Sequence, residues 1–219
     1  MTTIDRRSVL LLPAAVGATL AAAPLLARAQ AGKSSAVLAL VLEPPSLDPT
    51  VAAAAAIGAV VHYNILEGLT KINSDGSVTP LLAESWSVAP DGRSYTFRLR
   101  RGVKFSDGEA FDAAAVKFSF ERAKAEGSTN KARRAVFDNI SSIGTPDAHT
   151  VILTLDNADG NFLFRMGENT AVILHPKTAA QAATRPVGTG PYLLQDWRKG
   201  ASITLAAWPG ARAQPRLKK

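Results

Sequence analysis

The chain has 219 residues, enough for one or two domains with a sizeable apolar core. It contains no cysteine, which excludes disulfides, thiolate metal sites and a lipid-anchored N-terminal cysteine. Its formal net charge of +7 would suit a nucleic-acid-binding protein, but the basic residues are spread along the chain and mixed with acidic ones. We therefore interpret the basic residues as part of an ordinary solvated surface and predict no nucleic-acid partner.

Residues 1–29 have the organisation of an export signal peptide. Arg6-Arg7 forms a charged start, residues 8–26 form an apolar run, and Ala27-Arg28-Ala29 has the small-residue pattern that precedes a cleavage site. Adjacent arginines before a weakly apolar run favour twin-arginine export, although the flanking residues depart in part from that motif. A membrane-spanning helix is the alternative, but two prolines and a glycine interrupt the run. The sequence predicts a periplasmic protein whose signal is cleaved before Gln30.

The first part of the mature chain predicts a buried strand and a stiff loop. Residues 36–42 are a continuous apolar run, as in a strand that is covered on both faces. The run leads into Glu43-Pro44-Pro45-Ser46-Leu47-Asp48-Pro49, where three prolines forbid regular structure. Because α/β sheets bind ligands at the carboxyl ends of parallel strands, this loop is a candidate ligand-contacting segment. A rigid connector is the alternative.

A helix and a β-hairpin are expected next. Thr50 is a candidate cap for a helix over 51–66, with Gly68 as a left-handed stop, and residues 69–72 predict a short strand. The dipeptide Asp91-Gly92 is typical of a tight turn, and apolar residues alternate with polar ones on both sides of it. We predict a hairpin with four side chains in the core: Trp86, Tyr95, Phe97 and Leu99.

The rest of the chain predicts short elements of both kinds. Asp112 is expected to cap a helix that ends near residue 125 and buries Ala113, Val116, Phe120 and Ala123. The elements expected after it are strands at 140–143, 150–155 and 171–174, helices at 161–166 and 176–183, and a hairpin of 192–197 with 201–208.

Little in the sequence indicates catalysis or metal binding. His62, His149 and His175 lie far apart and lack metal-ligand spacing. Residues 156–160 resemble a calcium loop, but Leu155 stands where the EF-hand pattern needs aspartate, so we predict a turn. There is also no nucleophile elbow and no phosphate-loop lysine. We predict no metal, no cofactor and no enzymatic activity, with an exported hydrolase as the alternative.

The exact residues of several segments are more specific than these general patterns. Six segments, in order, resemble the signature of one family, the periplasmic extracellular solute-binding proteins of family 5, which are dipeptide/oligopeptide-type receptors of ABC importers. The resemblance extends from residue 37 to about residue 217. The matching segments are Glu43–Pro49, Leu66–Thr70, Pro80–Trp86, Asp91–Arg100, Gly102–Gly108 and Pro186–Tyr192.

The resemblance implies an α/β fold of the type II periplasmic-binding-protein kind. Residues 30–219 would be a partial solute-binding domain, an incomplete first lobe with its extra subdomain. Residues 30–66 and 186–219 would belong to the main sheet and residues 67–185 to the subdomain. The second lobe is expected to be absent, because members of the family continue well beyond this length.

The resemblance also implies a function and a site. The chain would be the substrate-binding component of an ABC importer that captures a small molecule or a peptide, with an ABC permease in the inner membrane as its partner. The ligand contacts would be Glu43, Pro44, Pro45 and Ser46, and we expect a monomer. A non-functional fragment of such a receptor is the alternative, since one lobe would offer a peptide one wall only.

Overall fold

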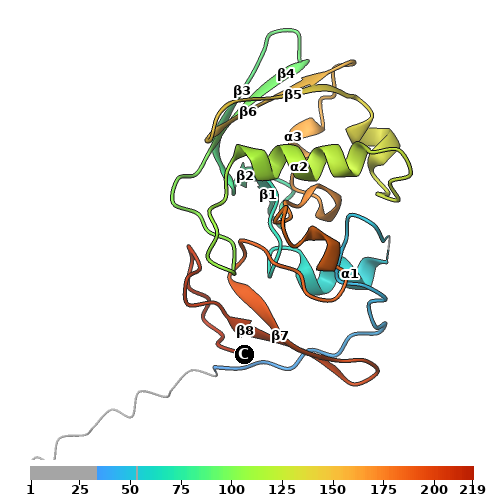
Figure 1. The fold of residues 1–219 in the computed structure, drawn as a ribbon, viewed down its shortest axis with the longest axis vertical. Coiled ribbons are helices and arrows are strands. Elements are labelled where there is room, and N and C mark those ends of the chain that lie inside the picture. Colours follow the sequence, from blue (N-terminus) through green and yellow to red (C-terminus); the bar gives the residue numbers. More distant parts are fainter. Residues whose placement is uncertain (1–33, 53) are drawn as a thin grey trace, which may run out of the picture. The chain divides into compact units, whose positions relative to one another are not determined.

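A computed structural model describes residues 34–52 and 54–219 (Figure 1), so the predicted export signal lies outside the described residues. Eight strands form three antiparallel sheets in the described part of the chain. Their bounds are β1 Thr70–Ile72, β2 Val78–Pro80, β3 Ala83–Val88, β4 Ser94–Leu99, β5 Ile140–Asp147, β6 Thr150–Leu155, β7 Tyr192–Arg198 and β8 Ser202–Ala207. The α-helices there are α1 Ala55–Val61, α2 Ala113–Lys124 and α3 Phe162–Arg165, with short turns of π- or 3₁₀-helix at Arg133–Phe137, Asn169–Ala171 and Ala179–Gln181.

The largest sheet has four strands in the order β3-β4-β6-β5. The predicted hairpin forms its first half, with Trp86 opposite Phe97. Gly92 has a φ of 68°, the positive value that the tight turn needs, and the Asp91 carboxylate accepts a hydrogen bond from the Arg93 amide at 2.9 Å. The turn residues therefore fix the register that the alternating pattern predicts.

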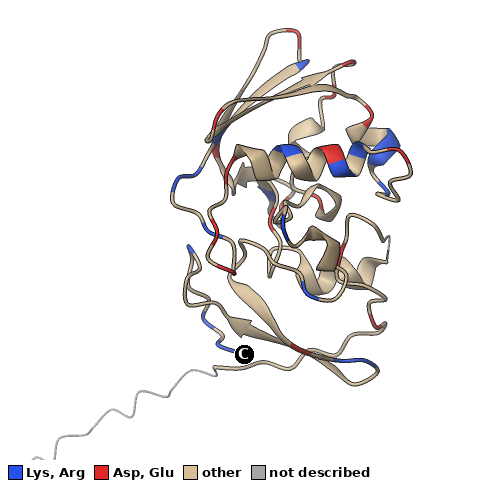
Figure 2. Cartoon of the chain, viewed as in Figure 1, with Lys and Arg blue, Asp and Glu red and all other residues tan. Residues whose placement is uncertain are grey.

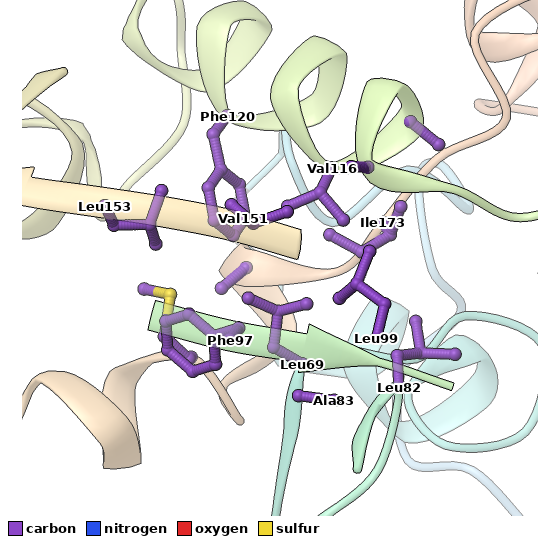
Figure 3. Close-up of a cluster of buried hydrophobic side chains, with 14 of the residues drawn as sticks. Leu69, Leu82, Ala83, Phe97, Leu99, Val116, Phe120, Val151, Leu153 and Ile173 are labelled. Carbon is purple, nitrogen blue, oxygen red and sulfur yellow. The ribbon is translucent and has the colours of Figure 1, made fainter. Parts of the chain in front are cut away.

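Helix α2 lies against this sheet and closes the larger hydrophobic core (Figure 1). Asp112 caps the helix as predicted, since its carboxylate accepts a hydrogen bond from the Ala115 amide at 3.1 Å. Val116 and Phe120 on α2 face the side chains of the strands (Figure 3). The four side chains expected to be buried on α2 are all in the core: Ala113, Val116, Phe120 and Ala123.

A second core cluster lies around helix α1 and the two-stranded sheet β7–β8. Its fully buried members include Leu47 before α1 and Ile57 within it. The β7–β8 hairpin, which was predicted from its sequence, packs on this cluster through partly buried apolar side chains. These side chains are Leu194, Trp197, Ile203 and Leu205.

The predicted strand at 36–42 is not formed. The segment is extended but pairs with no described strand, and Val37 and Val41 are each 99% exposed. Its backbone bonding is confined to its start, where the Ala36 amide donates to the Lys219 carbonyl at 3.2 Å. A strand buried on both faces needs covering layers and neighbouring strands, and the described part of the chain supplies neither.

Helix α1 is shorter than the predicted span of 51–66. Thr50 does not cap it, because the Thr50 hydroxyl donates to the Asp48 carboxylate at 2.6 Å. The residue before the helix is Ala54, which makes no side-chain cap bond. Gly68 was expected to adopt a positive φ, and it does not. Its glycine character is instead required by packing, since a Cβ there would lie 2.5 Å from the Met166 carbonyl oxygen.

Three further boundaries differ from the sequence prediction. Residues 171–174 form no strand. The segment makes only isolated backbone hydrogen bonds, such as that from the Ile173 amide to the Glu67 carbonyl at 2.9 Å. The helix expected at 176–183 is reduced to one 3₁₀ turn. Strand β5 continues beyond the expected end at residue 143 because its pairing with β6 extends to Asp147. In each case long-range packing decides the local structure.

One histidine, His62 at the C-terminal end of α1, has a largely buried ring. The His62 ring stacks on Tyr63 with the centroids 3.8 Å apart. Burial lowers the pKa of His62 below its usual value, and the Gly167 backbone carbonyl offsets part of that lowering. Its Nε2 is buried without a hydrogen-bond partner among the described residues.

We therefore expect the protein to lose stability in mild acid. The folded-state pKa of His62 is lower than its unfolded value of about 6.5, so the stabilisation is present above that pH and is lost as the pH falls through the folded value. His62→Gln should make the free energy of unfolding depend less on pH in this range. Urea unfolding between about pH 5 and pH 8 measures the effect. An equal acid loss in the variant would show that other groups cause it.

Candidate ligand-binding site

The predicted ligand loop is anchored at its start by the β7–β8 hairpin. The Glu43 carboxylate accepts hydrogen bonds from the Trp197 indole Nε1 at 3.1 Å and from the Gly200 amide at 3.0 Å. Gly200 has a φ of 74°, so the turn between the strands takes a conformation that suits glycine. Glu43 thus connects the loop to a turn that lies more than 150 residues later in the chain.

The next residues form a tight local turn. Pro44 is buried and Pro45 is exposed, while the Ser46 hydroxyl accepts a hydrogen bond from the Asp48 amide at 3.0 Å. Asp48 is itself fully buried, and its carboxylate accepts from the Thr50 amide at 2.9 Å. Prolines and side-chain acceptors together satisfy the backbone of a segment that has no regular structure. The structure places the four predicted residues together because they are consecutive.

Helix α2 holds this turn from the other side. Arg122 forms an ion pair with Asp48, with Nη2 at 2.9 Å from Oδ2, and it also contacts the Thr50 hydroxyl. Thr129 follows the helix and donates to the Val51 carbonyl at 2.7 Å. The buried Asp48 charge is therefore paired and hydrogen-bonded, as burial of a carboxylate requires. The result is a loop fixed to two distant segments.

Sequence reasoning missed the residues that anchor the loop. Arg122, Thr129, Trp197 and Gly200 lie between 70 and 160 residues from their partners. One signal was present for the first of them, since Arg122 precedes Ala123 at the edge of the buried face of α2. A long polar side chain on such an edge can contact a neighbouring segment of the chain as well as water.

A second buried charge connects two of the matched segments. Glu67 is 4% exposed, and its carboxylate accepts from the Thr189 hydroxyl at 2.9 Å and from Arg212 Nη2 at 3.0 Å. The segment 186–192 approaches the chain before Glu67 so closely that side chains are excluded. A Cβ on Gly188 would lie 1.9 Å from the Ile65 carbonyl oxygen. The two glycines beside Thr189 thus serve backbone packing.

His175 lies beside a carboxylate and a hydroxyl, but not in the geometry of a catalytic triad. His175 is buried, and its Nδ1 lies 2.9 Å from the Asp107 carboxylate and 3.3 Å from the Thr178 hydroxyl. Both partners meet the same ring nitrogen, whereas a catalytic triad uses one nitrogen for the carboxylate and the other for the nucleophile. Within the described ranges, no group of three or more potential metal ligands is present. No helix there combines the length and apolar character that crossing a membrane requires.

Solved structures with this fold are periplasmic binding proteins. AgaA from A. tumefaciens R10, solved with agropinic acid, superposes with a TM-score of 0.74 at 34% identity over 80% of this chain and 36% of its own. DppA from Helicobacter pylori, solved with the peptide STSA, gives a TM-score of 0.70 at 28% identity over 79% of this chain and 39% of its own. The fold is therefore that of a periplasmic binding protein, as the sequence predicted, and the chain corresponds to part of it.

The family follows from a direct match of the sequence. Residues 77–219 match the family model described as bacterial extracellular solute-binding proteins, family 5 Middle. The chain belongs to this family. The glutathione-binding protein GsiB of Pectobacterium atrosepticum is 32% identical over 95% of this chain and 40% of its own length. The probable D,D-dipeptide-binding periplasmic protein DdpA of Escherichia coli K12 is 30% identical over 93% and 42%. The chain spans about two fifths of these two relatives.

Proposed function

We propose that this chain is the substrate-binding component of an ABC importer, or part of one, and that it captures a peptide or a similar small solute in the periplasm. It would act by binding and not by catalysis, and it would deliver the solute to a permease in the inner membrane. The family match carries this proposal, because the relatives that cover most of the chain are named as binding proteins for glutathione and for dipeptides. A non-functional fragment is the other outcome of the test below.

The ligand contacts would be Glu43, Pro44, Pro45 and Ser46. Support comes from the way the loop is built, since the prolines and the Asp48–Arg122 ion pair hold it rigid before any ligand arrives. A preorganised loop loses little conformational entropy on binding. The exposed Pro45 and the partly exposed Ser46 remain accessible to a ligand.

The division of the domain would follow the two core clusters. The larger cluster draws all its buried members from residues 69–173, within the proposed subdomain of 67–185. The smaller cluster combines residues 47–66 with partly buried residues of β7 and β8, which belong to the proposed main-sheet parts 30–66 and 186–219. Its remaining fully buried members come from 172–182, where the two parts adjoin, and Phe118 of α2 also packs against it.

A chimera with a relative tests binding directly. In it, residues 30–219 replace the matched part of E. coli DdpA, and calorimetry follows titration with dipeptides, D,D-dipeptides and glutathione. We expect one of these solutes to bind. Glu43→Ala and Ser46→Ala should each weaken binding by about tenfold, the equivalent of roughly 1.4 kcal/mol.

The control for these variants is Glu126→Ala, which removes an exposed carboxylate in the loop after α2. It should leave affinity unchanged, and circular dichroism should show that all variants remain folded, with a modest fall in melting temperature for Glu43→Ala because its bonds to Trp197 and Gly200 are lost. A folded chimera that binds none of the solutes would favour the non-functional fragment. Unchanged affinity in both loop variants would reduce the loop to a connector.

Export is a separate proposal that rests on residues 1–29. We expect the full chain to reach the periplasm by the twin-arginine route and to begin at Gln30 after cleavage. Replacing Arg6-Arg7 with two lysines should block export, because that route depends on the arginine pair. Fractionation followed by mass spectrometry of the N-terminus measures both points. Uncleaved protein in the membrane fraction would contradict the proposal.

A further inference from the structure

A cavity of about 330 Å³ lies where four separate segments of the chain meet. None of its lining residues belongs to the loop of residues 43–46, so it is distinct from the proposed solute contacts. The loop after β4 supplies one wall, and the C-terminal part of the chain supplies another. The lining residues are Glu84, Arg100, Arg101, Gly102, Val103, Lys104, Thr189, Gly210 and Arg212.

The lining carries four cationic side chains and one carboxylate. Arg100, Arg101 and Lys104 come from one loop, and Arg212 comes from the far end of the chain. Figure 2 shows basic residues in blue along the loop after β4 and on the C-terminal segment. A concave surface with charges of one sign concentrates the electrostatic potential and attracts ions of the opposite sign.

Two of these cationic side chains already have bonding partners within the protein. Arg212 is paired with the buried Glu67, and the Arg100 Nε donates to the Leu81 carbonyl at 2.6 Å. Arg101 and Lys104 differ, since neither takes part in any ion pair within the described part of the chain. The buried Thr189 also lines the wall, but its hydroxyl already donates to the Glu67 carboxylate. The cavity thus combines fixed polar groups with two uncompensated positive charges.

We propose that this cavity is a binding site for a small oxyanion, either inorganic phosphate or the carboxylates of an organic acid. Arg101 and Lys104 supply the charge that the anion neutralises, and the anchored Arg100 presents guanidinium N–H groups to it. Charge-assisted hydrogen bonds of this kind are about twice as strong as neutral ones. The lone lining carboxylate, Glu84, opposes the anion and lowers the affinity.

Calorimetry on the full chain tests the site with inorganic phosphate and, separately, with citrate, each against sodium chloride of equal ionic strength. Binding of either anion supports the proposal, and the one that binds identifies the group. Arg101→Gln with Lys104→Gln should weaken binding by at least about tenfold, since two charged contacts are lost. Glu84→Gln should tighten binding, because it removes the repulsive charge.

The matched control is Lys131→Gln with Arg134→Gln, which removes two exposed cations that do not line the cavity. It should leave the affinity unchanged. Absence of binding by both anions would overturn the proposal, as would an equal loss in the control variant, which would reveal a general charge effect. The proposed solute binding does not depend on the result, since the two sites share no residue.

Discussion

Replacing Phe97 with alanine is expected to lower the free energy of unfolding by about 3–5 kcal/mol. The side chain is fully buried in the centre of the four-stranded sheet, opposite Trp86 on β3 and Val151 on β6 (Figure 3). Alanine would leave a cavity in the larger hydrophobic core. Both the lost transfer of the ring from water and the unfilled volume contribute to the loss.

Urea unfolding followed by circular dichroism measures this effect, and Val88→Ala is its control. Val88 lies on the same hairpin but is 44% exposed, so its truncation should change stability by less than about 1 kcal/mol. A loss below about 1 kcal/mol for Phe97→Ala would mean that the hairpin register or the burial of its ring is wrong.

Gly188→Ala is expected to prevent stable folding or to cost more than about 4 kcal/mol. A Cβ at this position would lie 1.9 Å from the Ile65 carbonyl oxygen and 2.8 Å from its carbon. Both are backbone atoms, so relief requires the two segments to separate. Separation would break the bond from the Gly190 amide to the Ile65 carbonyl at 3.0 Å. It would also weaken the contact between Thr189 and Glu67.

The matched glycine control is Gly160→Ala. Gly160 has no positive φ, and a Cβ there would meet no atom within 4 Å. We expect its melting temperature to stay close to that of the unchanged chain, whereas Gly188→Ala should reduce the yield of soluble protein or melt many degrees lower. Equal melting of the two variants would show that the close approach at Gly188 can relax.

Local patterns in the sequence were sufficient for the hairpins and for helix α2. In the first hairpin the alternation around Asp91-Gly92 specifies the turn and the buried face of β4, and all the information lies within about 15 residues. Trp86 on β3, also predicted to be core, is only partly buried. Asp112 similarly marks the start of α2 with a single cap bond. Such elements carry their own signals, because their hydrogen bonds join residues that are close in sequence.

Elements that depend on distant partners could not be predicted in this way. Residues 36–42 have the composition of a buried strand, but a strand forms only where neighbours exist to pair with it. The ion pairs of Glu67 with Arg212 and of Asp48 with Arg122 join residues 145 and 74 positions apart. No local pattern specifies such pairings.

The ligand loop is an intermediate case. Its position and stiffness follow from its prolines, and the structure adds what the sequence did not indicate, the bonds from Trp197 and Gly200 to the Glu43 carboxylate. The assignment of Glu43, Pro44, Pro45 and Ser46 as ligand contacts remains a prediction. In that role the Glu43 carboxylate would bind a ligand while it also accepts hydrogen bonds from the β7–β8 hairpin.

The bond between Ala36 and Lys219 has a consequence for the order of folding during synthesis. Ser34 and Ala36 bond only to Lys218 and Lys219, at the far end of the described chain. The ribosome therefore releases Ser34 and Ala36 long before Lys218 and Lys219 exist, and closing so large a loop is slow. The larger core, built from residues 69–173, can form meanwhile. Val37 and Val41 stay exposed in the folded chain as well, so chaperones that bind extended apolar segments would find them both during synthesis and after folding.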